Sequence, residues 1–356
     1  MAICNYKKWL FQVEIFSLSI IAVILLVAVF DFTNGFHDAA DMVATAIASR
    51  AMKPAVAIAI VSCFTFIAPF TVGLAVADTV GTFVNISSSS PLTGESVVIG
   101  ALLAAISYNL VTWKLGYPSS SSNSLAGGLV GAGLYAVGAQ QIQWGIDALQ
   151  GGELQGVMKV VAGLFASPVL GFVIGFISMK FIFTAFSRFT EKISGLFIFS
   201  QYFSVAWLGF SHGANDAQKG MAIIGMILLA NGMTPEFSIP LWAVAWCASA
   251  ITLGTIFGGW RIIRTLGFGL FRVKITHSVA NQLGSALVNT LATVIGAPTS
   301  TSQVVTATLL GNGAAEKPGH VKWRTAAGIV SGWWMNLPVS MLLGWFYCFL
   351  YTAIRS

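Results

Sequence analysis

Long apolar runs broken by short polar motifs dominate this chain of 356 residues. A helix that crosses a bilayer needs about 20 apolar residues. On that measure the sequence predicts about twelve helical segments, near residues 10–30, 36–50, 54–77, 95–114, 120–138, 157–183, 196–212, 214–231, 238–262, 277–296, 300–311 and 324–351. Four of the shorter segments begin at a polar motif: 36–50, 120–138, 214–231 and 300–311. This pattern predicts an all-α integral membrane protein with broken helices and two re-entrant hairpins.

Composition supports a membrane protein. Hydrophobic residues make up 56% of the chain and charged residues only 8%, whereas a soluble domain carries about 25% charged residues. So few charges could not cover a surface that faces water, so lipid must be the solvent over most of it. The basic residues cluster in short loops, with no aromatic residues interleaved, and this excludes nucleic-acid binding. The four cysteines lie far apart and show no metal-ligand spacing.

Two motifs recur in the same order. Residues 32–39 (FTNGFHDA) align with residues 210–217 (FSHGANDA) at an offset of 178, and residues 117–123 (YPSSSSN) align with residues 297–303 (APTSTSQ) at an offset of 180. We therefore expect an internal duplication. It comprises a first repeat at 10–140, a linking transmembrane helix and cytoplasmic loop at 141–194, a second repeat at 195–315 and a C-terminal transmembrane helix at 316–356.

Charge predicts the orientation of the two repeats. Four loops near residues 50–53, 180–192, 261–274 and 317–324 hold twelve of the 18 Lys and Arg residues, and we assign them to the cytoplasm. The first hairpin then enters from outside and the second from inside, with both termini outside. Inverted repeats with interrupted helices are typical of secondary transporters, whose site lies near the bilayer midplane.

Paired acidic residues predict a cation site. Asp38 and Asp216 occupy equivalent places in the two repeats, and Asp41 lies one helical turn after Asp38. An ionisable group at bilayer depth needs a partner or a water-filled cavity. Carboxylates beside amide oxygens suit Na⁺ or a proton, although helix capping is an alternative role. The predicted cation ligands are Asn34, Asp38, Asp41, Asn215, Asp216 and Gln218.

The two hydroxyl-rich runs predict an anion site. We expect proline to end the preceding helix in each run, which leaves hydroxyl groups at the start of the next helix. Free N–H groups and the positive end of the helix dipole favour an anion there. Two such tips from opposite faces could surround a tetrahedral oxyanion. The predicted anion-binding residues are Ser119, Ser120, Ser121, Ser122, Asn123, Thr299, Ser300, Thr301, Ser302 and Gln303.

These two sites predict coupled transport. Carboxylates alone would repel an anion, and a bound cation removes that repulsion, so the pattern indicates cation-coupled anion symport. His37, His212 and Lys219 are candidates for proton carriage or substrate contact. Helix-turn hydrogen bonding for the histidines, and pairing with aspartate or snorkelling for the lysine, are the alternatives.

At these residues the chain resembles the inorganic phosphate transporter (PiT) family. The resemblance rests on both Asp motifs, on the two Pro-hydroxyl runs and on the late helix with Trp323, Trp333 and Pro338, and it covers nearly the whole chain. It implies phosphate import with Na⁺ or H⁺, a transport region and a scaffold region, homodimers, and a place in the bacterial or archaeal plasma membrane. It implies no enzyme activity and no cofactor beyond Na⁺ as the coupling ion.

The sequence departs from that family at three positions. Asp41 stands where many members have Asn, and Asn123 and Gln303 stand where many have His. Loss of both hairpin histidines favours Na⁺ over a proton. The alternatives left open are a sulfate permease of the same family, a passive anion channel and an intramembrane aspartyl protease.

Overall fold

All regular structure in the chain is helical, apart from one isolated bridge, within the residues that a computed structural model describes: 18–86, 90–186 and 194–355. The helices are α2 (Leu18–Ala48), α3 (Pro54–Ile67), α4 (Ala75–Gly81), α5 (Pro91–Leu115), α6 (Ser121–Ala136), α7 (Ile146–Gln150), α8 (Gly156–Phe186), α9 (Ser194–Ala230), α10 (Leu241–Phe257), α11 (Trp260–Phe268), α12 (Ile275–Val294), α13 (Thr301–Glu316) and α14 (Trp323–Arg355). Four of these helices are long and apolar enough to cross a membrane, or up to six spans if each bent pair counts as one. This confirms the all-α membrane class.

The two Asp motifs do not break their helices. The sequence predicted breaks between residues 30 and 36 and between residues 212 and 214, but α2 and α9 run through both places without interruption. The motif glycines explain the difference. A Cβ at Gly35 would overlap the carbonyl oxygen of Ile251 in α10, and a Cβ at Gly213 would overlap that of Thr65 in α3. Both glycines therefore allow close helix packing and do not interrupt the helix.

The helix breaks lie in the segments that were expected to be straight spans, 54–77 and 238–262. The helix that begins at Pro54 bends by 74° before α4, and α10 bends by 65° before α11. Gly258, with φ 60°, ends α10 in a conformation that suits glycine. The protein therefore contains broken helices, as predicted, but the two breaks lie at other positions than those predicted at the Asp motifs.

Each hairpin turns at a glycine. The sequence predicted that Pro118 and Pro298 end the preceding helices, but α5 is capped by Gly116 (φ 76°), and Gly296 (φ 66°) follows the C-cap of α12. A left-handed glycine is a common helix C-terminus because it carries no Cβ. The next helix then starts at a serine N-cap: the Oγ atoms of Ser120 and Ser300 accept hydrogen bonds from backbone N–H groups at 3.1 and 3.3 Å.

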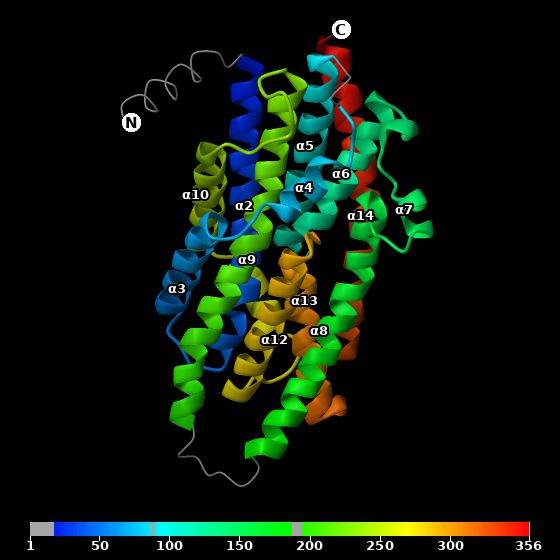
Figure 1. Cartoon of the computed structure of the whole chain (residues 1–356). Coiled ribbons are helices and arrows are strands. Elements are labelled where there is room, and N and C mark those ends of the chain that lie inside the picture. Colours follow the sequence, from blue (N-terminus) through cyan, green and yellow to red (C-terminus); the bar gives the residue numbers. More distant parts are fainter. Residues whose placement is uncertain (1–17, 87–89, 187–193, 356) are drawn as a thin grey trace, which may run out of the picture.

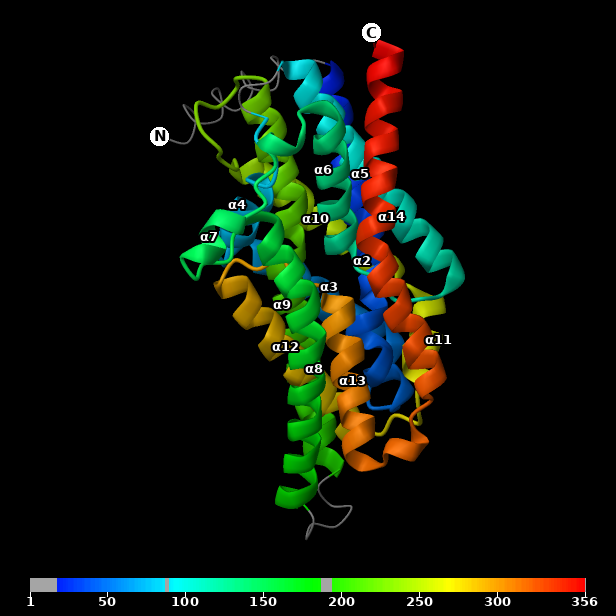
Figure 2. The same ribbon diagram turned by 90° about the vertical axis from the view of Figure 1, so that its right-hand side faces the viewer.

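The two hairpins occupy opposite halves of the molecule. Figure 1 shows α5 and α6 in the upper half and α12 and α13 in the lower half, with both tips near the middle. Packing is reciprocal, because α14 runs along α6 and α8 runs along α13, as Figure 2 also shows. The start of α2 and the end of α14 lie at the same end of the molecule, as the expected orientation requires. The division into repeats at the bounds given above stays a prediction.

Buried apolar side chains form two large clusters, one in each half. The first cluster contains Phe30 of α2 and the last turns of α9, and the second contains Met42 of α2 and the middle of α13. The polar motifs of α2 and α9 lie between the two clusters. The core is therefore two apolar layers on either side of a buried polar layer.

Candidate functional site

The polar layer forms where α2 and α9 meet the two hairpin tips. On the α2 side, the Ser302 hydroxyl at the second tip lies 2.9 Å from Asp38 Oδ1 and also contacts the Asp41 carboxylate. The His37 Nδ1 atom lies 3.0 Å from the same Asp38 oxygen. All four side chains are buried. His37, Asp38 and Asp41 each offer a ligand atom within 4.8 Å of the others, as a cation site requires.

On the α9 side, Asp216 collects three partners. Its carboxylate lies 2.6 Å from His212 Nδ1, accepts a hydrogen bond from Thr301 at 3.1 Å and pairs with the Lys219 ammonium group. Ligand atoms of Asp38, His212 and Asp216 also lie within 4.8 Å of one another. The two Asp motifs, 178 residues apart, therefore meet in one cluster.

The first hairpin tip closes the cluster from the opposite half. Ser122 donates a hydrogen bond to the backbone carbonyl of Thr299 at 2.5 Å, so the two tips touch directly. Lys219 donates to the Ser122 hydroxyl and to the same carbonyl. Ser121 donates to the Asn34 amide oxygen at 2.6 Å, and Ser119 lies 3.3 Å from His37 Nε2. The two hydroxyl tips and both Asp motifs therefore meet in one buried cluster, while anion binding there stays a prediction.

Other predicted cation ligands hold the site together. The Gln218 amide bonds to the backbone of Gly73, Val76, Ala77 and Ala214, so it anchors the start of α4. The Asn215 amide bonds to the backbone of Ala297 and Thr299 and fixes the second tip. Both side chains position backbone near the site and use their amide oxygens in doing so.

Some predicted anion-binding residues have different surroundings. The hydroxyls of Ser120 and Ser300 are used as helix caps. Gln303 lines an apolar cavity of about 360 Å³ with Phe165 and Trp333, between α8, α13 and α14. Asn123 is buried at the first turn of α6. The hydroxyls that meet the central cluster are those of Ser119, Ser121, Ser122, Thr301 and Ser302.

The two repeats carry different charges in this cluster. By the offset of 178, Asp41 corresponds to Lys219. Asp216 is therefore paired with a lysine, whereas Asp38 and Asp41 share the Ser302 hydroxyl and the imidazoles near Asp38 are those of His37 and His212. Two buried carboxylates this close need a cation or a proton to remain together. The arrangement therefore suits one hard cation on the α2 side and an anion at the helix N-termini of the two tips.

Sequence reasoning missed two supporting asparagines. Asn289 of α12 donates to Thr301 at 3.4 Å, and Asn336 of α14 donates to the Ser120 carbonyl at 2.7 Å. Asn289 corresponds to Asn109 of α5 at the offset of 180, so a full comparison of the two repeats would have found it. Asn336 has no such signal, since only folding brings α14 against α6.

A buried polar cluster between two opposed hairpins, in a helical membrane protein, defines a secondary transporter. The chain belongs to the phosphate transporter family, whose model matches residues 34–344. This confirms the resemblance seen in the sequence. The family is one of transporters and not of enzymes, so the aspartyl protease alternative is excluded. The chain is a multi-pass membrane protein.

Two bacterial relatives match over almost their full length. A probable low-affinity inorganic phosphate transporter of Rhizobium meliloti is 37% identical over 326 residues, which is 91% of this chain and 94% of the relative. One of Bacillus subtilis with the same description is 35% identical over 94% of this chain and 97% of the relative. A solved structure described as the sodium-dependent phosphate transporter shares the fold, with a TM-score of 0.82, 22% identity, and coverage of 95% of this chain and all of that one.

Proposed function

We propose that this protein imports inorganic phosphate by symport with a cation, and that the cation is Na⁺. Phosphate follows from the family and from the relatives, which are described as inorganic phosphate transporters. The coupling follows from charge in the central cluster. The cell membrane as location and a homodimer as the assembly belong to the same proposal.

The observation that carries the coupling is the buried Asp38–Asp41 pair with Ser302 between them. Na⁺ bound to these oxygens neutralises the pair and lowers the cost of bringing an anion into the same layer. The anion then binds between the tips, where the N–H groups at the starts of α6 and α13 and the hydroxyls of Ser122 and Thr301 can donate to it. Phosphate and Na⁺ therefore stabilise each other's binding.

Lys219 has a second role in this proposal. Its ammonium group holds the two tips together through Ser122 and the Thr299 carbonyl. A phosphate between the tips would take over these contacts and form an ion pair with the same ammonium group. Without phosphate, the Lys219 ammonium group therefore occupies part of the anion site. The two tips separate when phosphate enters.

Uptake of labelled phosphate into proteoliposomes tests the proposal. An inward Na⁺ gradient should drive uptake, and excess sulfate should not compete. In Asp41→Asn, the Na⁺ concentration for half-maximal uptake should rise by about tenfold or more, because a charge-assisted ligand contributes roughly 1.5–3 kcal/mol. Asp147→Asn, at an exposed position of α7, is the control and should behave like the unmodified protein.

Two results would contradict the proposal in different ways. Uptake that follows only a pH gradient would assign a proton to the Asp38–Asp41 pair. Uptake of sulfate in place of phosphate would overturn the substrate and leave the coupling in place.

A further inference from the structure

A polar stripe leads from the site toward one end of α2. Asp38, Asp41 and Thr45 follow one another at spacings of three and four residues, so they share one face of α2, and Ser49 directly follows the last residue of the helix. Thr45 is buried, and Ser49 lies at the rim of a cavity at the end of the helix. The stripe therefore connects the central carboxylates to that cavity.

A second polar stripe lies on α12, which packs against α2. Asn289, Ser285, Asn281 and Ser278 share one face of the helix at spacings of three and four residues, and all four are fully buried. The Gln282 amide joins the two helices, with Nε2 3.2 Å from the Met42 carbonyl and 3.5 Å from Thr45 Oγ1. Asn289 reaches the central site through Thr301.

Most of this second stripe does not hold helices together. Gln282 bonds across the interface, as polar residues between membrane helices commonly do. In the described part of the chain, by contrast, the hydroxyls of Ser278 and Ser285 and both side-chain polar atoms of Asn281 have no hydrogen-bond partner. Buried polar groups without partners cost free energy and call for a functional explanation. These groups would be satisfied if they contacted water or a hydrated ion in another conformation of the protein.

Most of the matching positions in the other half are apolar. The repeat offset holds in the structure, since Gly116 and Gly296 both adopt positive φ just after their helices. At that offset Ser278, Asn281 and Ser285 correspond to Val98, Ala101 and Ala105 of α5, and at 178 Thr45 and Ser49 correspond to Ile223 and Ile227 of α9. Asn289, beside the central cluster, corresponds to the polar Asn109, but polarity between the cluster and the cavity is a property of one half only.

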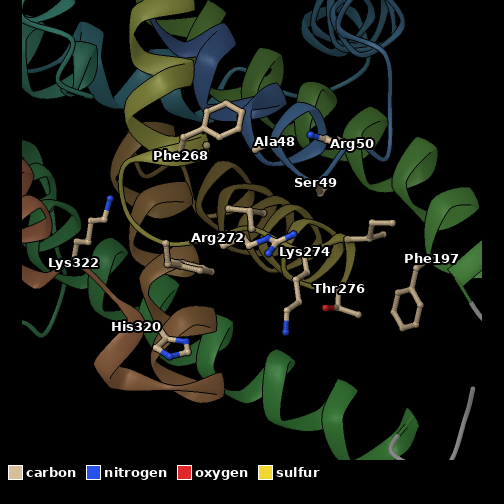
Figure 3. Close-up of a pocket in the computed structure, with 14 residues that line it drawn as sticks. Ala48, Ser49, Arg50, Phe197, Phe268, Arg272, Lys274, Thr276, His320 and Lys322 are labelled. Atoms are coloured by element: carbon tan, nitrogen blue, oxygen red, sulfur yellow. The ribbon is translucent and has the colours of Figure 1, made fainter. Parts of the chain in front are cut away.

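The cavity at the end of the stripes is basic. It measures about 970 Å³, and Figure 3 shows Arg50, Arg272, Lys274 and Lys322 around it; no carboxylate is among the described residues that line it. Positive charge places this end in the cytoplasm. Phe271 lines the cavity, and its ring packs edge-on against that of His277, the residue before Ser278 in α12, with the ring centroids 5.1 Å apart. An aromatic side chain therefore lies where the α12 stripe meets the cavity.

We propose that the α2 and α12 stripes form the cytoplasmic half of the transport route, which opens past Phe271 into the basic cavity. Because its walls are polar, water can enter this half after a small movement. In the outer half, water can enter only after apolar faces separate. The identity of the transported solute rests on the proposed function, whereas the position of the route is argued independently of it.

Cysteine labelling tests this route. In a background with the native cysteines replaced, Asn281→Cys and Ser285→Cys are treated with a charged methanethiosulfonate reagent in inside-out and in right-side-out membrane vesicles. Ala101→Cys and Ala105→Cys, at the equivalent positions of α5, are the matched controls. We expect positions 281 and 285 to label about tenfold or more faster than the controls, a ratio worth ~1.4 kcal/mol, and only from the cytoplasmic side.

Equal rates at all four positions, or labelling of 281 and 285 from outside, would overturn the route. Ser285→Cys changes one atom, so it keeps the test available if Asn281→Cys does not fold. The readout is also independent of the solute. If the expected labelling appears without phosphate uptake, the route stands and the proposed substrate fails; if phosphate is taken up without that labelling, the route fails alone.

Discussion

At the scale of single residues, Lys219 shows how far sequence reasoning reaches. Its place in the motif identified it as a candidate for substrate contact, but pairing with an aspartate and snorkelling fitted equally well. The structure excludes snorkelling, because the side chain is buried and binds Asp216 and both hairpin tips, while substrate contact stays a prediction. Removal of one partner from a buried ion pair is strongly destabilising, because it leaves the other charge buried and uncompensated.

The substitution Lys219→Met should therefore abolish phosphate uptake and destabilise the protein. Loss of one partner from a buried ion pair costs about 3–5 kcal/mol, which should lower the midpoint of thermal unfolding in detergent. The double variant Lys219→Met with Asp216→Asn removes both charges and should recover most of that stability without recovering uptake. If the double variant were as unstable as the single one, the ion pair would not be what stabilises the tips.

At the scale of elements, the motif glycines serve helix packing. The sequence predicted that the polar motifs containing Gly35 and Gly213 interrupt α2 and α9. Both remain continuous because a neighbouring helix lies against each glycine, at Ile251 and at Thr65. Close helix contact is a tertiary property, and no local pattern distinguishes it from a break.

The substitution Gly35→Ala should consequently lower the thermal unfolding midpoint, because overpacking costs about 1–3 kcal/mol. Gly213→Ala in the other repeat should have a similar effect. Gly328→Ala in α14 is the matched control, since a Cβ there meets no atom within 4 Å. It should be neutral or slightly stabilising. A Gly35→Ala protein as stable as the control would mean that α10 can move away from α2 at little cost.

At the scale of the whole molecule, the two halves share a backbone pattern and differ in chemistry. Both contain a hairpin that turns at a left-handed glycine and starts its second helix at a serine cap. Within the described residues, the polar stripes and the basic cavity belong to the half assigned to the cytoplasm. A positive cavity concentrates anions near its mouth and does so less well at high ionic strength.

The double substitution Arg272→Gln with Lys322→Gln should therefore raise the KM for phosphate presented to the cytoplasmic face. The increase should be several-fold at low salt and should shrink as the ionic strength approaches about 1 M, where the Debye length is about 3 Å. Inside-out vesicles measure this KM, and right-side-out vesicles should show no change. Lys180→Gln, an exposed cation of α8 outside the cavity, is the control. A salt-independent effect would count against electrostatic attraction of the anion.

The membrane class, the duplication, the two Asp motifs, the two hydroxyl-rich runs and the family resemblance can all be recognised without coordinates. These features depend on composition and on patterns repeated along the chain. The positions of the helix bends emerge only from the folded chain. So do the contacts of Gln218 with backbone, the place of Gln303 beside an apolar cavity and the contacts of Lys219 with both tips. Those facts depend on which helix lies beside which, because packing and burial set the energy of each glycine, amide and charge.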